Sequence, residues 1–353
     1  MRNGNGKFYL RRREFMAGLA ATGASALLSP SWARAQSPGR VVVGTWGGDY
    51  ARLLNENIEQ PFLIPEGWEV VQDQAGDPER RAKLLAERRL PTGSTDIQGL
   101  NGVNMYQMFE LGLTQEIDWS RIPNGENQMA SFKLPYAVPH IYSGKVVVFN
   151  PDTVESKPTS YAEALDPARG SDLGIIDIQY QYVISAAALA AGGSVTAVDE
   201  GKRLLLELRS AGARIYPTNE AFAQGLETEE INCGIMWKAR VVQWQNAGIN
   251  VVAVTPSEGI LPYTSGMVIA KNAPNVDGAY AYLNAMLEPA AQLSFAEDMG
   301  YDGTITNTGI EGELKERIGF TEEEAANMKD LDYEFLLEAD VELKNWWDRE
   351  FKA

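Results

Sequence analysis

The sequence is nearly free of the two side chains that most often carry metal-binding and nucleophilic chemistry. Among 353 residues it has one cysteine, Cys233, and one histidine, His140. These two cannot build a zinc cluster, a single cysteine cannot form an internal disulfide, and a serine–histidine–aspartate triad would have to use His140. We therefore expect no metal site, a core role for Cys233 in the apolar run 231–236, and a structural role for His140.

Motifs that indicate an enzyme are missing as well. The chain has no G-x-S-x-G nucleophile elbow, no phosphate-binding Gly-Lys-Ser loop and no Glu-x-x-His pair. A carboxylate pair of the glycosidase kind stays open, because aspartate and glutamate are too numerous for the sequence to single out two. The expectation is a protein without cofactor and without catalytic activity.

The apolar run near the N-terminus, residues 17–28, is too short and too rich in small residues to span a bilayer. It follows three arginines at 11–13 and precedes an Ala-Arg-Ala motif. This order is typical of a secretory signal peptide, and Arg12-Arg13 with Phe-Met two residues further on indicates the twin-arginine route. We expect residues 1–35 to be cleaved near Ala35, leaving a periplasmic protein.

Positive charge is also in short supply. The formal net charge is −17, and it becomes −22 without residues 1–35, which carry six basic residues and one acidic residue. Such an acidic excess repels nucleic acid and anionic lipid. It predicts a protein without nucleic-acid partners and without stable membrane insertion.

One stretch near the start of the mature chain combines a strand, a turn and a helix. Three valines at 41–43 predict a buried strand, the Gly-Gly pair after Trp46 predicts a sharp turn, and Asp49 is expected to cap the helix that Tyr50 continues. In an open α/β sheet such a turn lies at the carboxyl end of its strand, where small ligands bind. The turn is either half of a ligand site or an ordinary strand–helix connection with Trp46 in the core.

The rest of the chain alternates strands and helices, which predicts an α/β protein of two domains or two lobes. Strands are expected at 68–72, 96–100, 145–149, 173–178, 231–237, 251–254 and 267–270. One helix is expected to begin at Asp77-Pro78 and to carry Leu84 and Leu85. Further helices are expected at 103–111, 161–165, 183–191, 198–211, 239–247, 274–287, 290–299 and 333–351. The chain is expected to cross between lobes near 142–150 and again at 262–265.

Short motifs occur in a characteristic order along the mature chain. They are Trp-Gly-Gly-Asp-Tyr at 46–50, Val-Phe-Asn at 148–150 with Lys-Pro-Thr-Ser-Tyr at 157–161, Ile-Met-Trp at 235–237, Pro-Ser-Glu-Gly at 256–259, Ala-Pro-Asn at 273–275 with Ala-Tyr at 279–280, and the closing Trp-Trp at 346–347. Together they resemble the extracellular solute-binding proteins of the spermidine/putrescine type, which feed ABC importers.

The resemblance implies the two-lobed periplasmic-binding-protein fold of type II, in which crossover strands form a hinge and the ligand is enclosed between the lobes. On this plan residues 41–142 and 264–320 form lobe 1, residues 143–263 form lobe 2, and the helices of 321–353 pack on the lobes. The resemblance also implies a monomer whose partners are a small-molecule solute and the permease subunits of an ABC transporter.

In such a site, aromatic rings sandwich the ligand while carboxylates hold its ammonium groups. At three positions where the family has carboxylates, this chain has neutral side chains. The predicted ligand-binding set comprises the aromatic residues Trp46, Tyr50, Tyr142, Trp237 and Tyr263, the turn residues Gly47, Gly48 and Asp49, the neutral replacements Gln179, Tyr182 and Ser265, the nearby Asp177, and Lys238.

Two ligand classes remain open. The family and the acidity favour a polyamine-like amine, whereas the neutral replacements favour a small organic anion or an amine that bears a carboxylate. Lys238 supports the second class, because a cation at the start of a helix is unfavourable unless an anionic group pairs with it; the plain alternative is a solvated surface lysine. A rival of a different kind is an enzyme exported by the twin-arginine route.

Overall fold

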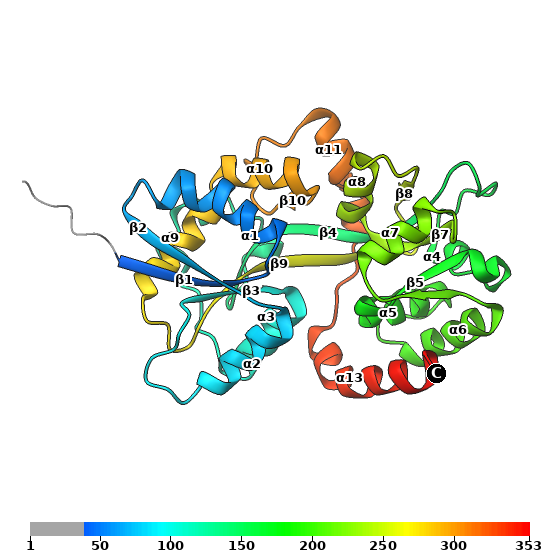
Figure 1. Cartoon of the computed structure of the whole chain (residues 1–353), viewed down its shortest axis with the longest axis horizontal. Coiled ribbons are helices and arrows are strands. Elements are labelled where there is room, and N and C mark those ends of the chain that lie inside the picture. The colour runs from blue at the N-terminus through cyan, green and yellow to red at the C-terminus, as the bar shows by residue number, and fades with distance from the viewer. Residues whose placement is uncertain (1–38) are drawn as a thin grey trace, which may run out of the picture. The chain divides into compact units, whose positions relative to one another are not determined.

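The structure, a computed structural model, describes residues 39–353 (Figure 1). The predicted twin-arginine signal peptide, residues 1–35, lies outside the described residues. The described residues, 39–353, belong to one compact unit. In the part that is described, no helix is long and apolar enough to cross a membrane.

One mixed sheet runs through the whole unit. Its strand order is β2 (Trp68–Gln74), β1 (Gly39–Thr45), β3 (Ile97–Asn101), β9 (Leu261–Ile269), β4 (Val138–Phe149), β7 (Cys233–Trp237), β5 (Leu173–Ile176) and β6 (Arg214–Tyr216), while β8 (Val252–Val254) and β10 (Asp302–Gly303) pair with β4. The hydrogen-bonded ladder therefore continues from one half of the sheet to the other through β9 and β4.

The pairing changes direction at the middle of the sheet. Pairs β1–β2, β1–β3, β5–β6 and β5–β7 are parallel, whereas β3–β9, β9–β4 and β4–β7 are antiparallel. The two segments predicted to cross between lobes lie opposite each other, with Tyr142 facing Thr264 and Lys145 facing Leu261. Figure 1 shows β4 and β9 running between the two groups of helices. The exact lobe boundaries stay a prediction.

The helices occupy the connections between these strands. They are α1 (Asp49–Leu54), followed by a π-helical segment (Asn55–Leu63), α2 (Asp77–Glu87), α3 (Gly102–Glu110), α4 (Tyr161–Ala164), α5 (Tyr180–Ala190), α6 (Val198–Ala211), α7 (Asn219–Glu227), α8 (Lys238–Asn246), α9 (Val276–Met286), α10 (Pro289–Met299), α11 (Gly312–Ile318), α12 (Glu322–Ala326) and α13 (Tyr333–Trp346). The sequence predicted most of these helices and missed α7 and α11.

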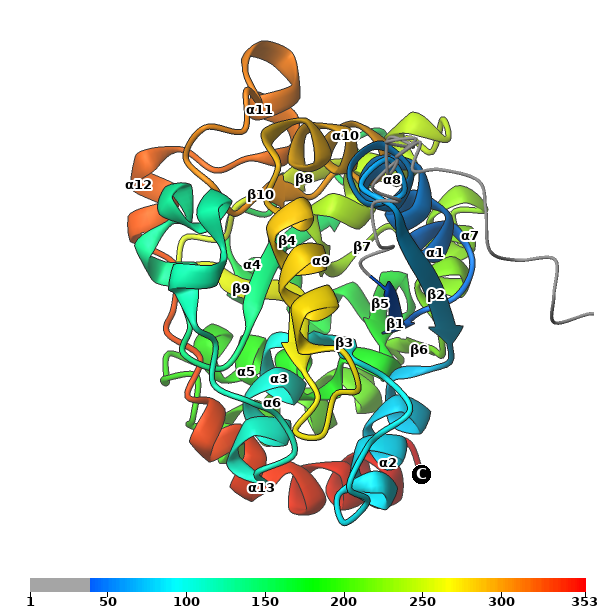
Figure 2. The same cartoon turned by 90° about the vertical axis from the view of Figure 1, so that its left-hand side faces the viewer.

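Alternation of side chains along β9 explains why helices cover both faces of the first half of the sheet. Met267 and Ile269 belong to a buried cluster that also contains residues of α1, α9 and α10, whereas Val268 belongs to a second cluster with residues of α2 and α3. Successive side chains of a strand point to opposite faces, so both faces need an apolar cover. Figures 1 and 2 show α9 and α10 on one side of these strands and α2 and α3 on the other.

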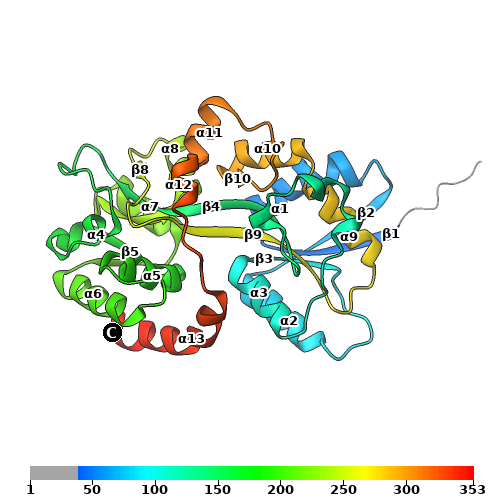
Figure 3. The same ribbon diagram turned by 180° about the vertical axis from the view of Figure 1, so that it is seen from behind.

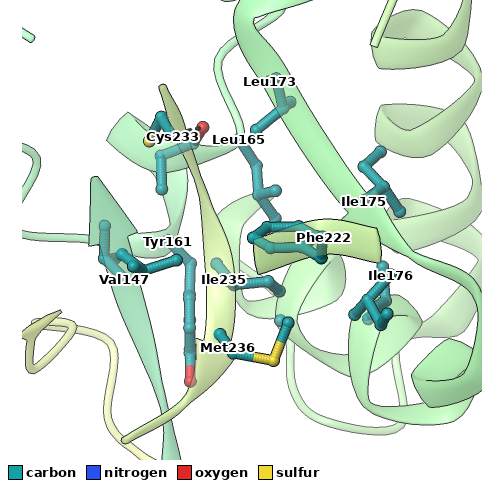
Figure 4. Close-up of a cluster of buried hydrophobic side chains, with 14 of the residues drawn as sticks. Val147, Tyr161, Leu165, Leu173, Ile175, Ile176, Phe222, Cys233, Ile235 and Met236 are labelled. Carbon is teal, nitrogen blue, oxygen red and sulfur yellow. Dashed lines mark hydrogen bonds between the residues drawn. The ribbon is translucent and has the colours of Figure 1, made fainter. Parts of the chain in front are cut away.

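The second half of the sheet has its own core. Phe222, Ile235 and Met236 pack there with side chains of β4, β5 and α4, as the close-up in Figure 4 shows. Cys233 lies in the same cluster with no exposed surface, and burial raises the pKa of its thiol to about 11. The predicted core role of Cys233 is confirmed.

The turn after β1 differs from expectation in one detail. Gly48, with φ of 66°, is the residue that caps α1, and Asp49 is the first helical residue rather than the cap. Gly48 takes this role because its positive φ is available to glycine at little cost. Asp49 instead forms an exposed ion pair with Arg52 one turn further along.

The C-terminal helix returns to both halves of the molecule. Helix α13 contacts α3 in one half and α5 in the other, and Trp346, Trp347 and Phe351 enter the core of the second half. Figure 3, the view from behind, shows α13 running beneath α5 and α6. The acidic run after Thr321 starts α12 with a capping box between Thr321 and Glu324, in line with the helix start predicted there.

A buried carboxylate ties the first strands to α9 and supplies a stability test. Asp96, 1% exposed, accepts hydrogen bonds from the backbone N–H groups of Val42 at 2.7 Å and Asn275 at 2.5 Å. We expect Asp96→Asn to turn an amide N–H₂ group toward one of these donors and to lower the free energy of unfolding by about 1–3 kcal/mol, measured by urea denaturation.

The matched control is Asp73→Asn. Asp73 accepts a single hydrogen bond, from Lys83 at 2.5 Å. Both side chains of this pair are about one third exposed. A surface ion pair contributes little, so its loss should cost less than about 1 kcal/mol. Equal effects of the two substitutions would contradict the structural role of Asp96.

Candidate functional site

A cavity of about 340 Å³ lies where the first βα turn meets the crossover strand β9. The residues around it come from six separate parts of the chain. They are Trp46, Gly47, Asp49, Tyr50, Ile141, Glu220, Arg240, Tyr263, Ser265, Met299 and Tyr301. We call it the inner cavity.

A second cavity of about 750 Å³ adjoins it, bounded by the starts of α2, α3 and α5 and by α13. Its lining residues are Trp46, Asp77, Pro78, Arg81, Asn101, Val103, Asn104, Gln107, Asp177, Ile178, Tyr180, Gln181, Tyr182, Tyr263, Leu336, Leu337, Asp340 and Lys344. We call it the outer cavity. Trp46 and Tyr263 line both cavities, so these two rings mark where the cavities meet.

A run of aromatic rings crosses this region. Tyr182 packs edge-on against Trp237 with ring centroids 4.7 Å apart, Trp237 lies 5.1 Å from Tyr263, and Tyr263 lies 5.8 Å from Tyr301. Trp46 makes its own edge-on contact with Tyr50 at 5.1 Å. The arrangement supplies flat apolar walls whose negative ring faces attract cations.

Trp46 is held in place by a buried cation. The guanidinium of Arg80 lies 4.2 Å from the centre of the indole, and its Nη2 donates to the carbonyl of Gly99 at 2.7 Å. Arg80 also donates to the carbonyl of Ala75. Because Arg80 is only 1% exposed, burial lowers its pKa, and backbone carbonyls and the indole take the place of a carboxylate partner. The indole is therefore fixed from behind, with its other surface on the cavities.

His140 orients Tyr50 in a comparable way. The Tyr50 hydroxyl and His140 Nε2 are 2.6 Å apart, and His140 is 1% exposed. Burial lowers the pKa of His140 to about 3, so the imidazole is neutral at physiological pH and can accept the hydrogen bond of the phenol. This agrees with the predicted structural role of His140.

Of the thirteen predicted ligand-binding residues, eight line one or both cavities. Their role in binding stays a prediction. The inner cavity contains Gly47, Asp49, Tyr50 and Ser265, the outer cavity contains Asp177 and Tyr182, and both contain Trp46 and Tyr263. The other five, which line neither cavity, are Gly48, Tyr142, Gln179, Trp237 and Lys238.

Tyr142 is directed away from the site because of its position along β4. Its hydroxyl donates to Asp302 at 2.8 Å and its ring packs 5.0 Å from Phe132, while the preceding residue, Ile141, lines the inner cavity. Neighbouring residues of a strand point to opposite faces of the sheet. Tyr142 therefore lines neither cavity. Without the strand register, the sequence could not tell which residue near the crossing faces the cavity.

Gln179 and Trp237 form a layer behind the cavities rather than their surface. Gln179 accepts a hydrogen bond from Lys145 and donates to Asn219 at 2.8 Å. The Lys145 ammonium, fully buried, lies 4.4 Å from the centre of the Trp237 ring, and desolvation lowers its pKa well below its usual value. Trp237 is 5% exposed and its ring packs against that of Tyr263, so in this structure it contacts a cavity-lining ring and does not itself line a cavity.

Lys238 is engaged by protein groups and lines neither cavity. Its ammonium donates to the carbonyl of Gly319 and lies 4.7 Å from the centre of the Phe320 ring, and burial lowers its pKa. The side chain is half-buried, so the alternative of a solvated surface lysine is wrong. The carbonyl of Gly319 and the ring of Phe320 stabilise the cation at this helix start, so it needs no anionic partner there.

Asp177 lines the outer cavity but is already paired. One of its oxygens accepts from the indole N–H of Trp347 at 2.6 Å and the other from Lys352 at 3.0 Å. The C-terminal segment therefore takes up both oxygens of this predicted ligand-binding carboxylate.

Residues that the sequence analysis missed include Arg240, Glu220, Tyr301 and Asp77. Arg240 lies in the first turn of α8, two residues after Lys238, and lines the inner cavity, so a cation of this helix start does reach a cavity. Glu220 lies on α7, a helix that was not predicted. Burial raises the pKa of Tyr301, and the nearby Arg240 guanidinium offsets part of that rise.

Metal chemistry has no evident site in the described chain. Among residues 39–353, no group of three or more histidine, cysteine, aspartate and glutamate side chains is arranged to hold a metal ion. The cavities offer aromatic surface and isolated charges, which suits the reversible capture of a small organic molecule.

Residues 60–316 match the family described as bacterial extracellular solute-binding protein. This match spans more than half of the chain, and the chain belongs to that family. The family is extracellular by its description, and it consists of solute-binding proteins, not enzymes.

Two curated relatives are similar over part of the chain. The spermidine/putrescine-binding periplasmic protein of Escherichia coli K12 is 27% identical over 209 residues, which cover 55% of this chain and 59% of that protein. The protein of the same description from Salmonella typhimurium is 26% identical over 209 residues. The chain thus matches less than two thirds of the length of these relatives.

Solved structures share the fold over almost their whole length. An ABC transporter structure from Clostridium perfringens has a TM-score of 0.75 at 23% identity, covering 88% of this chain and 99% of that one. The PotD substrate-binding protein of Streptococcus pneumoniae has a TM-score of 0.71 at 19% identity, covering 87% and 99%. A structure described as a GABA receptor has a TM-score of 0.78 at 20% identity, covering 89% and 98%. The predicted two-lobed periplasmic-binding-protein fold is confirmed.

The depressed pKa of His140 leads to a pH prediction. The unfolded chain binds a proton at this imidazole near pH 6.5, whereas the folded protein does so only near 3. The free energy of unfolding should therefore fall as the pH drops below about 6.5, by up to about 1.4 kcal/mol per pH unit from this group. The loss should be smaller in His140→Gln, which keeps a hydrogen-bonding group beside Tyr50.

Because His140 is the only histidine, NMR of tag-free protein reports on it without overlap. We expect the imidazole signals to stay constant between about pH 5 and 8. A titration with a midpoint near 6.5 would show that the ring is accessible to solvent and does not hold Tyr50.

Proposed function

We propose that this protein is the periplasmic substrate-binding component of an ABC importer, which captures a small organic solute between its lobes and delivers it to a membrane permease. The main support is that the walls of the inner cavity come from both halves of the sheet and from the crossover. Trp46 and Tyr50 lie on the first half, Glu220 and Arg240 on the second, and Tyr263 on β9 between them. A ligand that touches all of them favours the closed form over the open one.

The solute is proposed to be a small organic amine, either polyamine-like or bearing a carboxylate. The names of the curated relatives support an amine, since both are described as spermidine/putrescine-binding proteins. The charges of the cavities favour a solute with a small net positive charge, because carboxylates stand there beside the cations Arg81, Arg240 and Lys344. The inner cavity is also small, about 340 Å³.

Binding should depend on the two rings that the cavities share. We expect Tyr263→Ala to lower the affinity for the solute at least about tenfold, because it removes one wall of both cavities. The solute is first identified by native mass spectrometry of protein purified from its own periplasm, and affinity is then measured by calorimetry and by the ligand-induced rise in melting temperature.

Trp119→Ala is the matched control for Tyr263→Ala. Trp119 is a partly buried aromatic residue whose indole donates to the carbonyl of Leu134 at 2.9 Å, and it lines neither cavity. Its loss should lower the melting temperature and leave the ligand-induced rise intact. If Tyr263→Ala leaves the affinity unchanged, the solute does not bind against Tyr263, and the proposed binding site is wrong.

Export is proposed to follow the twin-arginine route with cleavage near Ala35. The support is the sequence of residues 1–35 alone. Replacing Arg12 and Arg13 together by lysine should keep the charge and abolish export, so that uncleaved protein accumulates in the cytoplasm. Cell fractionation and N-terminal sequencing provide the measurement, and normal periplasmic amounts of the double variant would point to another export route.

A further inference from the structure

Three side chains around the two cavities carry polar atoms that lack a protein partner. In the described chain, Asp77 Oδ2, the Tyr182 hydroxyl and Arg240 Nε are buried and make no hydrogen bond. Asp77 and Tyr182 line the outer cavity, and Arg240 lines the inner one. Most buried polar groups in proteins are paired, and each one left unpaired costs about 1–3 kcal/mol. Such a set around two adjoining cavities indicates partners supplied by a ligand.

The outer cavity offers an acceptor for a cation. The side chain of Asp77 is 15% exposed, and its Oδ1 accepts from Arg81 at 2.7 Å and from Asn104 at 2.8 Å, which leaves Oδ2 free. Asp177 in the same cavity is paired through both oxygens. An ammonium group that donates to Asp77 Oδ2 and to the Tyr182 hydroxyl would satisfy both orphan atoms.

The inner cavity offers a donor for an anion. Arg240 has one side-chain hydrogen bond, to Gln243 at 2.9 Å, and forms no ion pair within the described residues. Glu220 lines the same cavity without pairing with it. A guanidinium presents several N–H donors in a plane that matches a carboxylate. A carboxylate here would pair the charge and satisfy Nε.

Resting on the proposed function, we infer that the solute is a linear amino carboxylate that spans both cavities. Its carboxylate lies on Arg240, its ammonium lies on Asp77 and Tyr182, and its apolar chain passes between Trp46 and Tyr263. The charges of ligand and protein then balance at each end. A diamine of the same length would place an ammonium beside Arg240 and leave the guanidinium unpaired, which is unfavourable in a site shielded from water.

The test uses three matched series of compounds of increasing chain length, namely linear ω-amino carboxylates, α,ω-diamines and monocarboxylates, with affinity measured by calorimetry. We expect an amino carboxylate of one optimal length to bind wild-type protein about ten- to a hundredfold more tightly than the diamine or the monocarboxylate of that length. Equal binding of the matched diamine, or no binding by any amino carboxylate, would overturn the inference.

Two substitutions test the assigned binding sites of the two ends of the ligand separately. Asp77→Asn should lower the affinity for amino carboxylates about tenfold or more and leave that for monocarboxylates unchanged. Arg240→Gln should lower the affinity for amino carboxylates similarly and leave that for diamines unchanged or improved. Asp73→Asn, whose carboxylate lines neither cavity, is the control. If neither substitution changes the selectivity, the assigned ends are wrong.

Tyr182→Phe tests the outer end without disturbing the fold. It keeps the ring that packs against Trp237 and removes only the unpaired hydroxyl. The melting temperature without ligand should stay equal or rise, while the affinity for amino carboxylates should fall severalfold. A lower melting temperature with unchanged affinity would show that the hydroxyl is structural, and would overturn its role in binding.

Native mass spectrometry separates this inference from the proposed function. A co-purified solute that lacks either an amine or a carboxylate, and whose retention depends on Tyr263, would overturn the amino-carboxylate inference and leave the solute-binding function standing. Retention that is independent of Tyr263 would overturn both.

Discussion

The antiparallel pairing of β4 with β9 is the constraint on which the rest of the structure depends. These strands carry the ladder between two parallel half-sheets, and their register determines which side chains reach the cavities. Tyr263 and Ser265 line the inner cavity while Thr264 between them does not, as alternation along β9 requires. Asn101 at the end of β3 pairs with Ser265, which brings the carboxyl end of the first half-sheet to the crossover. A shift by one residue would exchange cavity-facing and core-facing side chains.

Three buried or half-buried cations near the cavities make their close contacts with carbonyl or amide oxygens and aromatic rings. Arg80 has carbonyls and the Trp46 indole, Lys145 has Gln179 and the Trp237 ring, and Lys238 has a carbonyl and the Phe320 ring. Carboxylates at the cavities are in part occupied by protein groups, as Asp177 is by the C-terminal segment. Free charge at the cavities is thereby reduced to a few side chains, and a site with few free charges selects a ligand by the spacing of its charged groups.

Much of the fold could be predicted from the sequence because local signals agreed with it. Helix α6 occupies the predicted residues 198–211, since its apolar stripe and the glycine after it are both local features. Helix α7 was missed although Thr218 caps it, because it is short and two of its four buried residues, Ala223 and Gly225, are small. Trp46 and Tyr263, chosen from motifs, line both cavities. Tyr142 and Lys238 line neither, because strand register and long-range partners such as Asp302 and Gly319 are set by tertiary packing, which local patterns do not encode.

The central claim is that two half-sheets joined by β4 and β9 close on a solute held at Trp46 and Tyr263. Small-angle X-ray scattering of the mature protein, without solute and at a saturating concentration confirmed by calorimetry, tests it most directly. We expect a smaller radius of gyration with solute bound, because the ligand favours the closed form, in which both halves of the molecule touch it. Superimposable scattering curves for free and saturated protein would contradict it.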